Sequence, residues 1–235
     1  MQLANVKTPA PLAPARADIV SALKEASAQT GVDFDYLLKN AAAESSFDPT
    51  AHSAHSSARG LFQFLESTWL DTLDKHGAKH GLGKEAAAIS RDAEGNAIVK
   101  DAGMRKQLLA LREDPRVSAL MAGEFTKDNR AVMEASLGRS VNNSELYMAH
   151  FLGATGASKL INQSAVHNTA PAASLFSQAA RANDAVFNRE GRALAFNEVK
   201  DNLSQRYSAQ ATMALEMLKL MRTALADETT QLWKA

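Results

Sequence analysis

Apolar residues recur at helical spacing along almost the whole chain, and this periodicity limits the protein to a helical fold class. The clearest case follows Asp33, a residue type that favours helix N-caps. There the spacing predicts a helix whose buried stripe consists of Phe34, Leu37, Leu38, Ala41 and Ala42. Similar stripes predict further helices from Arg16 to Gly31, around Trp69–Leu73, over Val117–Phe125, over Leu146–Leu152, from Pro171, and after Gly191 almost to the end.

One stretch, Ile89–Val99, favours strands, with Glu94-Gly95-Asn96 at its turn. Together these patterns predict a mainly α fold with one small β-hairpin and no internal repeat. Three prolines within the first fourteen residues favour an extended leader over residues 1–15. A globular domain is expected over residues 16–207, followed by a C-terminal helix over residues 208–235.

Charge and composition exclude several classes of function. Lys and Arg total 26, as do Asp and Glu, so no broad basic face is available for nucleic acid or anionic lipid. A bound polymer is therefore expected to be held by hydrogen bonds and stacking. The chain has no cysteine, which removes disulfides and thiolate chemistry. It also has no apolar run long enough to span a membrane, and residues 1–15 do not resemble an export signal.

Glu44 is the strongest candidate for a catalytic group. It lies seven residues after Leu37 on the same predicted helix, at the edge of the buried stripe, where a carboxyl is partly desolvated. It also falls in the last helical turn, near the negative end of the helix dipole. Both effects favour the protonated carboxyl that a general acid needs.

The residues around Glu44 carry a family resemblance. Glu44-Ser45-Ser46-Phe47-Asp48-Pro49, Ala51-His52-Ser53, Ala58-Arg59-Gly60-Leu61-Phe62-Gln63 and Thr68-Trp69 follow one another within about twenty-five residues. This string resembles the signature of family 1 lytic transglycosylases, bacterial enzymes that cleave peptidoglycan. The resemblance implies a lysozyme-like helical domain with a C-terminal helical extension. It also implies action in the periplasm or outside the cell, without a cofactor or metal.

The same resemblance implies a role for each matching residue. Glu44 protonates the glycosidic oxygen and then takes a proton from the muramyl C6 hydroxyl, leaving a 1,6-anhydro end. Ser53 orients the lactyl or acetamido group of the substrate. Phe62 and Gln63 line the subsite beside the bond, and the backbone at Gly60 approaches the sugar because glycine has no side chain. Core packing is the alternative role for Phe62.

Three features depart from the family pattern. The loop before Gly60 is one residue longer, and Phe62 stands where methionine is usual. The family often has a tyrosine facing the glutamate in Ala-Tyr-Asn-Ala-Gly, and here the comparable string is Ala149–Gly153, with His150 in that place. Tyr147 lies one turn earlier, so either side chain can be the one that reaches Glu44.

A hydrolytic muramidase is the first alternative, and it requires a second carboxylate near the first. The candidates are Asp48, Glu66 and Glu124. Asp48 has the position of a helix stop before proline, and Glu66 that of a first-turn helix charge. Glu124 falls on a buried stripe, where an ion-paired structural role is expected because buried charges are usually paired.

The C-terminal segment suggests a second alternative. Ala214, Met217, Leu218, Met221 and Leu225 share one helical face, which Met213 widens. This face is expected to pack on the core, and its alternative role is to dock a protein partner in a flagellar or secretion machine. In the extreme case the chain would be a wall-binding assembly module without activity.

Overall fold

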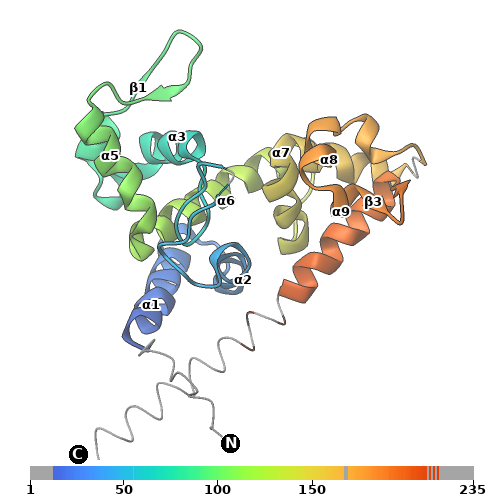
Figure 1. The fold of residues 1–235 in the computed structure, drawn as a ribbon, viewed down its shortest axis with the longest axis horizontal. Coiled ribbons are helices and arrows are strands. Elements are labelled where there is room, and N and C mark those ends of the chain that lie inside the picture. The colour runs from blue at the N-terminus through green and yellow to red at the C-terminus, as the bar shows by residue number, and fades with distance from the viewer. Residues whose placement is uncertain are drawn as a thin grey trace, which may run out of the picture.

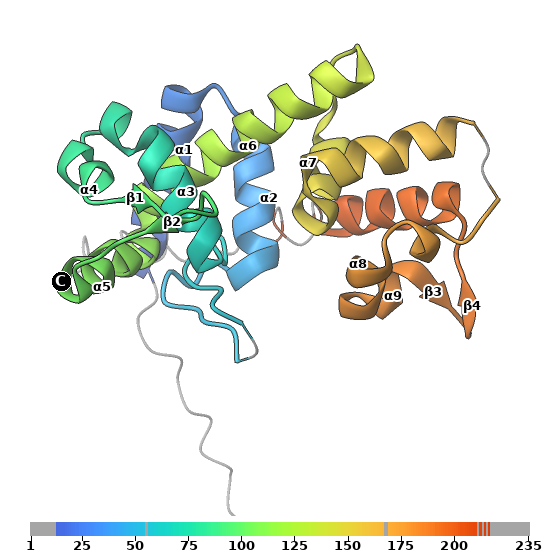
Figure 2. The same cartoon turned by 90° about the horizontal axis from the view of Figure 1, so that it is seen from above.

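The computed structural model describes residues 13–54, 56–166 and 169–210, together with residues 212, 214 and 216. The described chain is mainly helical with small hairpins, as the sequence predicts, and it forms two parts that α7 (Asn143–Ala165) joins (Figures 1 and 2). The first part contains α1 (Ala13–Thr30), α2 (Phe34–Ser45), α3 (Glu66–His76), η1 (Gly77–His80), α4 (Gly83–Ala87), β1 (Ser90–Arg91), β2 (Ala97–Ile98), α5 (Ala102–Ala110), η2 (Leu111–Glu113) and α6 (Pro115–Leu137). The second part contains η3 (Ala172–Ser174), α8 (Ser177–Ala182), α9 (Asp184–Phe187), β3 (Asn188–Arg189), β4 (Arg192–Ala193) and a helix over residues 196–210.

The helix that carries Glu44 follows its prediction closely. Asp33 caps α2 by accepting a hydrogen bond from the Tyr36 amide at 2.9 Å. The helix ends where Ser46 and Phe47 both take positive φ values, 53° and 63°, which reverses the chain sharply after Ser45. α1 begins at Ala13, three residues before the predicted start of the fold.

α6 is the central helix of the first part, and it packs against both α1 and α7. Gly123 makes the approach to α1 possible, since a Cβ there would lie 2.5 Å from Oγ1 of Thr30. Asp114 caps the helix through the Val117 amide, and Pro115 occupies its first turn, as predicted. None of the described helices is long and apolar enough to cross a bilayer.

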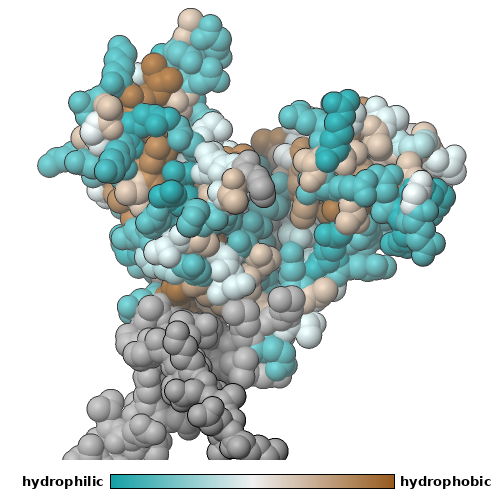
Figure 3. Space-filling view, in the orientation of Figure 1, coloured by the Kyte–Doolittle hydropathy of each residue, from teal (hydrophilic) through white to brown (hydrophobic). Residues whose placement is uncertain are grey.

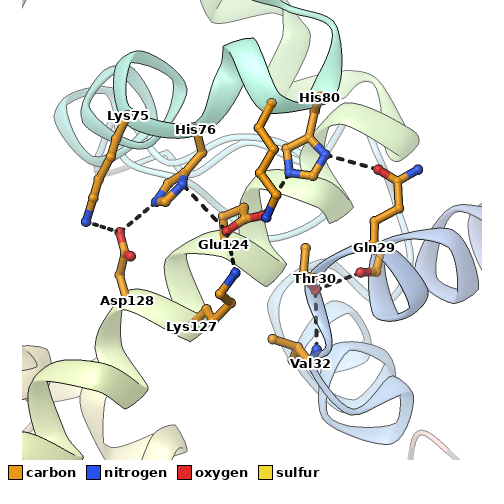
Figure 4. A network of polar contacts seen from close by, with 11 residues as sticks. Gln29, Thr30, Val32, Lys75, His76, His80, Glu124, Lys127 and Asp128 are labelled. Atoms are coloured by element: carbon orange, nitrogen blue, oxygen red, sulfur yellow. Dashed lines mark hydrogen bonds and ion pairs between the residues drawn. The ribbon is translucent and has the colours of Figure 1, made fainter.

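Glu124 lies in the middle of α6 with a side chain only 1% exposed. Its carboxylate accepts a hydrogen bond from Lys79 and contacts Nε2 of His80 at 2.9 Å, with Lys127 at 3.4 Å (Figure 4). Burial acts to raise the pKa of Glu124, but the hydrogen bonds from Lys79 and His80 outweigh it and hold the pKa at about 2. The predicted structural role of this carboxylate is therefore confirmed.

The network extends from Glu124 to three elements (Figure 4). One turn further along α6, Asp128 contacts Lys75 and Nε2 of His76, each at 2.8 Å. On the other side, Nδ1 of His80 lies 3.1 Å from the side-chain oxygen of Gln29 on α1. Polar contacts thus join α1, the α3–η1 segment and α6.

The helix predicted over Leu146–Leu152 is present as the first half of α7, with the capping box of Asn142 and Glu145, and it ends at Gly153 as predicted. A second helix, which the sequence analysis did not predict, follows directly. Gly153 takes φ 66° and ψ 164°, which kinks the chain, and helix then continues to Ala165. Glycine there breaks the direction of the helix because it reaches this backbone conformation without strain.

The second part also departs from the prediction of a single hairpin. β3 and β4 form another antiparallel hairpin, with Glu190 and Gly191 at its turn. Both turn residues have positive φ, 53° and 77°, as a tight two-residue turn requires. The predicted hairpin at Ser90↔Ile98 is also present. The helix predicted from Pro171 is instead divided between η3 and α8.

The C-terminal helix packs on the body of the protein as far as it is described. Tyr207 is 8% exposed, and Ala214 is fully buried. Core packing is therefore observed up to this position. Met213, Met217, Leu218 and Met221, on which the docking alternative rests, lie outside the described residues.

Replacing Glu124 by glutamine is expected to lower the free energy of unfolding by about 3 kcal/mol at neutral pH, because Lys79 and His80 lose their carboxylate. The pKa of about 2 lies below the value of 4.5 for an unperturbed glutamate. This stabilisation is therefore fully present above the higher value and is lost as the pH falls toward the lower one. Urea unfolding at neutral pH and in mild acid measures both effects. Glu94→Gln, at an exposed turn, is the control, and equal losses in the two variants would contradict the prediction.

Candidate active site

A cleft opens between α2, the loop that joins α2 to α3 (residues 46–65, the site loop), α6 and the first half of α7. Its described lining consists of Tyr36, Asn40, Glu44, Phe62, Gln63, Phe64, Leu65, Thr68, Ala122, Phe125, Thr126, Asn129, Leu146, Ala149 and His150. Glu44 is the one carboxylate among these residues, and no lysine or arginine is present in the set. Such a lining suits an uncharged polymer held by hydrogen bonds and apolar faces. Figure 3 shows that the surface of the molecule is indented between its two parts.

Glu44 and His150 meet in this cleft. Oε1 of Glu44 lies 3.0 Å from Nε2 of His150, although 106 positions separate the two residues. The Glu44 side chain is 20% exposed and that of His150 is 44% exposed, so the pair faces solvent from the His150 side. Burial acts to lower the pKa of His150, but the hydrogen bond and negative charge of Glu44 outweigh it, so the pKa is raised.

Tyr147 is the other side chain that the sequence offered as a neighbour of Glu44. It is only 2% exposed, and its hydroxyl pairs with Nε2 of Gln210 at 2.6 Å. Its ring lies nearly parallel to that of His150, at an interplanar angle of 9°. The structure therefore places His150 against Glu44, with Tyr147 behind it.

The site loop is tied to the end of α2 directly after Glu44. Oγ of Ser45 donates to the carbonyl oxygens of Ala41, at 3.1 Å, and Leu61, at 2.9 Å. This bond across sixteen residues brings the segment after Gly60 beside the catalytic candidate. Serine after the glutamate thus has a structural function in the motif.

The loop itself is folded by backbone pairing. The Ser53 amide donates to the Ala58 carbonyl at 3.0 Å, and the Gly60 amide donates to the Ala51 carbonyl at 2.7 Å. Ser53 is not among the described residues that line the cleft, and its role in orienting substrate stays a prediction.

The structure gives a packing reason for glycine at position 60. Gly60 is absent from the described cleft lining, and a Cβ on it would lie 1.9 Å from the backbone oxygen of Arg112. Glycine is required here because η2 packs closely against the loop and because the φ angle of Gly60 is +82°, while the approach of a sugar to this backbone stays a prediction. The Arg112 side chain strengthens this contact by donating to the carbonyls of Ser57 and Phe64, at 2.7 and 3.1 Å.

Phe62 and Gln63 both line the cleft, and their role in a sugar subsite stays a prediction. Phe62 is also 8% exposed and belongs to the hydrophobic core, so its alternative role in core packing is observed. Gln63 takes φ 48°, and its amide nitrogen donates to the carbonyls of Ala51 and Gly60, at 3.0 and 2.9 Å. It therefore braces the site loop from within the cleft.

The sequence analysis missed several polar lining residues. Asn40 lies one turn before Glu44 on the same face of α2, so helical spacing alone could have identified it. Thr126 and Asn129 come from α6, and no local signal connects them to Glu44. Only the packing of α6 under the cleft places them there.

The candidates for a second carboxylate are each occupied elsewhere. Asp48 accepts from the amide and hydroxyl of Thr50, at 2.8 and 2.7 Å. Glu66 is paired with Arg105, and Glu124 belongs to the buried network. Across the described residues, no group of three or more histidine, aspartate or glutamate side chains is arranged to hold a metal ion.

Comparison with known families gives a match in this region. Residues 21–83 match the family model described as Transglycosylase SLT domain. The SLT-matching segment is about a quarter of the chain and holds Glu44, the site loop and α3. It ends before α6 and α7, so His150 lies outside it. The match indicates transglycosylase activity on peptidoglycan, which confirms the expected substrate at this general level.

Two glycine substitutions test how the SLT-matching segment is held. Gly60 and Gly95 have φ values of +82° and +85°, but no atom lies within 4 Å of a Cβ built on Gly95. Gly95→Ala is expected to cost about 1–2 kcal/mol in unfolding free energy, the ordinary cost of this conformation. Gly60→Ala must also displace the Arg112 backbone, so the unfolding free energy should fall clearly more in this variant than in Gly95→Ala. Urea unfolding of both variants measures the difference, and equal losses would contradict this account of the loop.

Proposed function

We propose that this protein is a lytic transglycosylase of the family 1 type that cleaves the β-1,4 bond between N-acetylmuramic acid and N-acetylglucosamine. The single observation that carries the proposal is that Glu44 is the one carboxylate of the described cleft lining and lies 3.0 Å from His150. One carboxyl with no second carboxylate beside it suits a reaction in which the same group acts first as acid and then as base.

The proposed reaction needs no water. The protonated Glu44 donates its proton to the glycosidic oxygen, the bond from C1 to that oxygen breaks, and the N-acetylglucosamine side leaves with a hydroxyl group. The Glu44 carboxylate then removes the proton of the C6 hydroxyl of the muramyl residue. O6 bonds to C1 and closes a 1,6-anhydro ring, and Glu44 is protonated again.

His150 is assigned the role of a proton partner for Glu44. The two side chains lie within hydrogen-bond distance, at 3.0 Å, so a proton can pass between them. The carboxylate of Glu44 raises the pKa of His150, and His150 is assigned to supply its proton to Glu44 as the glycosidic oxygen begins to accept one. Its partly exposed ring can recover a lost proton from solvent.

Substrate recognition is assigned to the neutral walls of the cleft. Phe62 offers an apolar face to a sugar ring, while Asn40 and Asn129 offer amides for its polar substituents. Ser53, at the outer loop, is assigned to the lactyl or acetamido group. Peptidoglycan lies outside the cytoplasmic membrane, so the activity is extracytoplasmic, and we assign the protein to the periplasm or the cell exterior.

Hydrolysis is the second candidate, since a water molecule could attack C1 in place of O6. Hydrolysis would need a carboxylate that activates this water. The three candidates, Asp48, Glu66 and Glu124, are each bonded to other side chains, which counts against it. Mass spectrometry of fragments released from purified peptidoglycan separates the two reactions, because anhydro ends are lighter by one water. Binding to the wall without any cleavage would instead indicate the assembly-module alternative.

Glu44→Gln is expected to abolish release of fragments from purified sacculi while the melting temperature stays close to that of the unchanged protein. The amide keeps the shape of the side chain but cannot supply the proton. Asp48→Asn is the matched control, and it should retain most of the activity. A Glu44→Gln variant with a large part of the original turnover would overturn the assignment.

The pH dependence should report the Glu44–His150 pair. Activity is expected to fall as the pH rises through the raised pKa of His150, because the pair then loses its last proton. His150→Asn removes the titrating ring, so this fall should move to lower pH by about two pH units, the difference between the ordinary pKa values of histidine and glutamate, with a rate at least about tenfold lower near neutrality. Rate profiles of both proteins on the same sacculi measure the shift, and superimposed profiles would exclude the proposed role of His150.

A further inference from the structure

The C-terminal helix over residues 196–210 reaches the two helices that carry the catalytic pair. The ring centroid of Tyr207 lies 6.3 Å from that of Tyr36 on α2 and 5.6 Å from that of Tyr147 on α7. Tyr207 is 8% exposed, so these rings form part of the packed core. One side chain of the second part of the molecule therefore contacts both the helix of Glu44 and the helix of His150.

Tyr147 connects this contact to His150. Its ring lies nearly parallel to the imidazole, with centroids 6.4 Å apart, and its hydroxyl is held by Gln210 at 2.6 Å. Phe151 packs edge-on against both rings, with centroids 5.2 and 5.4 Å away. Because Tyr147 is 2% exposed, its ring cannot shift unless its neighbours move with it.

We propose that Tyr207 and Gln210 are positioning residues that act through Tyr147. By fixing the Tyr147 ring, they fix the imidazole of His150 and hold it against Glu44. The C-terminal helix, far outside the SLT-matching segment, thereby becomes part of the working active site without touching substrate. The consequence for catalysis rests on the proposed function, whereas the positioning itself does not.

The pKa of His150 can report the position of its imidazole ring, because few charged groups in the described part of the chain lie near these rings. Glu44 is the charged group whose interaction raises the pKa of His150. Lys39 of α2 lies over the Tyr207 ring, 5.2 Å from its centroid, and Arg206 of the C-terminal helix donates to a carbonyl of the second part. Tyr207 has its pKa raised to about 12 by burial, so it stays neutral near physiological pH. Gln210 carries no charge, so replacing it with an apolar residue removes no charge from the surroundings of His150.

The first measurement follows the His150 imidazole by NMR during a pH titration without substrate, with His150→Asn used to assign its signal. In Gln210→Leu the midpoint should fall by about 0.5 pH unit, because a looser contact with Glu44 stabilises the imidazolium less. Gln205→Leu makes the same chemical change on the exposed face of the same helix and should leave the midpoint unchanged. An unchanged midpoint in Gln210→Leu would overturn the positioning role, whether or not the protein cleaves peptidoglycan.

The second measurement tests whether Gln210 acts through Tyr147. Gln210→Leu and Tyr147→Phe should each lower kcat on sacculi about threefold to tenfold with little change in KM, and the double variant should be no worse than either one. Additive losses would contradict the proposed route. If the NMR shift is present but no variant or unchanged protein cleaves peptidoglycan, the proposed function fails and the positioning stands.

The ring of Tyr207 is tested with a conservative pair. Tyr207→Phe keeps the stacked ring and should retain both the His150 midpoint and the rate, whereas Tyr207→Leu should shift the midpoint as Gln210→Leu does. A large fall in melting temperature in Tyr207→Leu would remove that variant from the comparison. The decision then rests on Gln210→Leu, which keeps the rings of Tyr36, Tyr147 and Tyr207, and an unchanged His150 midpoint in that variant would overturn the proposal.

Discussion

The burial of Glu124 in the middle of α6 is the constraint around which the first part of the molecule is arranged. A carboxylate that is 1% exposed cannot stay charged without close polar partners, so Lys79 and His80 must approach it. Their approach fixes α3 and η1 against one side of α6. The adjacent positions Phe125 and Thr126 then face the cleft from the other side. The floor of the cleft is thus positioned by a polar network whose carboxylate, Glu124, does not line the cleft.

A second set of contacts holds the site loop in place over this floor. Ser45 bonds the Leu61 carbonyl, and Arg112 bonds two carbonyls of the loop while its backbone packs against Gly60. These bonds run from side chains to backbone oxygens, so they fix the course of the chain in the site loop. An irregular loop can therefore hold Phe62 at a fixed position in the wall of the cleft.

The contact between Glu44 and His150 depends on the joining of the two parts of the protein. Glu44 belongs to a helix of the SLT-matching segment, and His150 precedes the kink at Gly153 from which the second part extends. That second part returns through the C-terminal helix and places Tyr207 between α2 and α7. The SLT-matching segment therefore holds only one member of the pair. Its partner and the side chains behind that partner come from the remainder of the chain.

The sequence by itself determined the helical class, the caps at Asp33, Asp114 and Asn142, the hairpin near Gly95 and the place of Glu44 on its helix. These features depend on residues within a few positions of one another, so periodicity and capping chemistry are enough to specify them. The small hairpin after Phe187 and the continuation of helix beyond Gly153 were missed, because short strands and a kinked helix leave weak local signals.

Only the tertiary structure decided that His150 and not Tyr147 meets Glu44, that Gly60 makes room for the Arg112 backbone, and that Asn129 faces the cleft. Each of these contacts joins residues about fifty or more positions apart, and each depends on how several helices pack at once. The spacing of apolar residues along one helix shows which face is buried. It does not show which distant residue that face will meet, because the direction of α7 and the closeness of η2 to the site loop follow from the packing of the whole core.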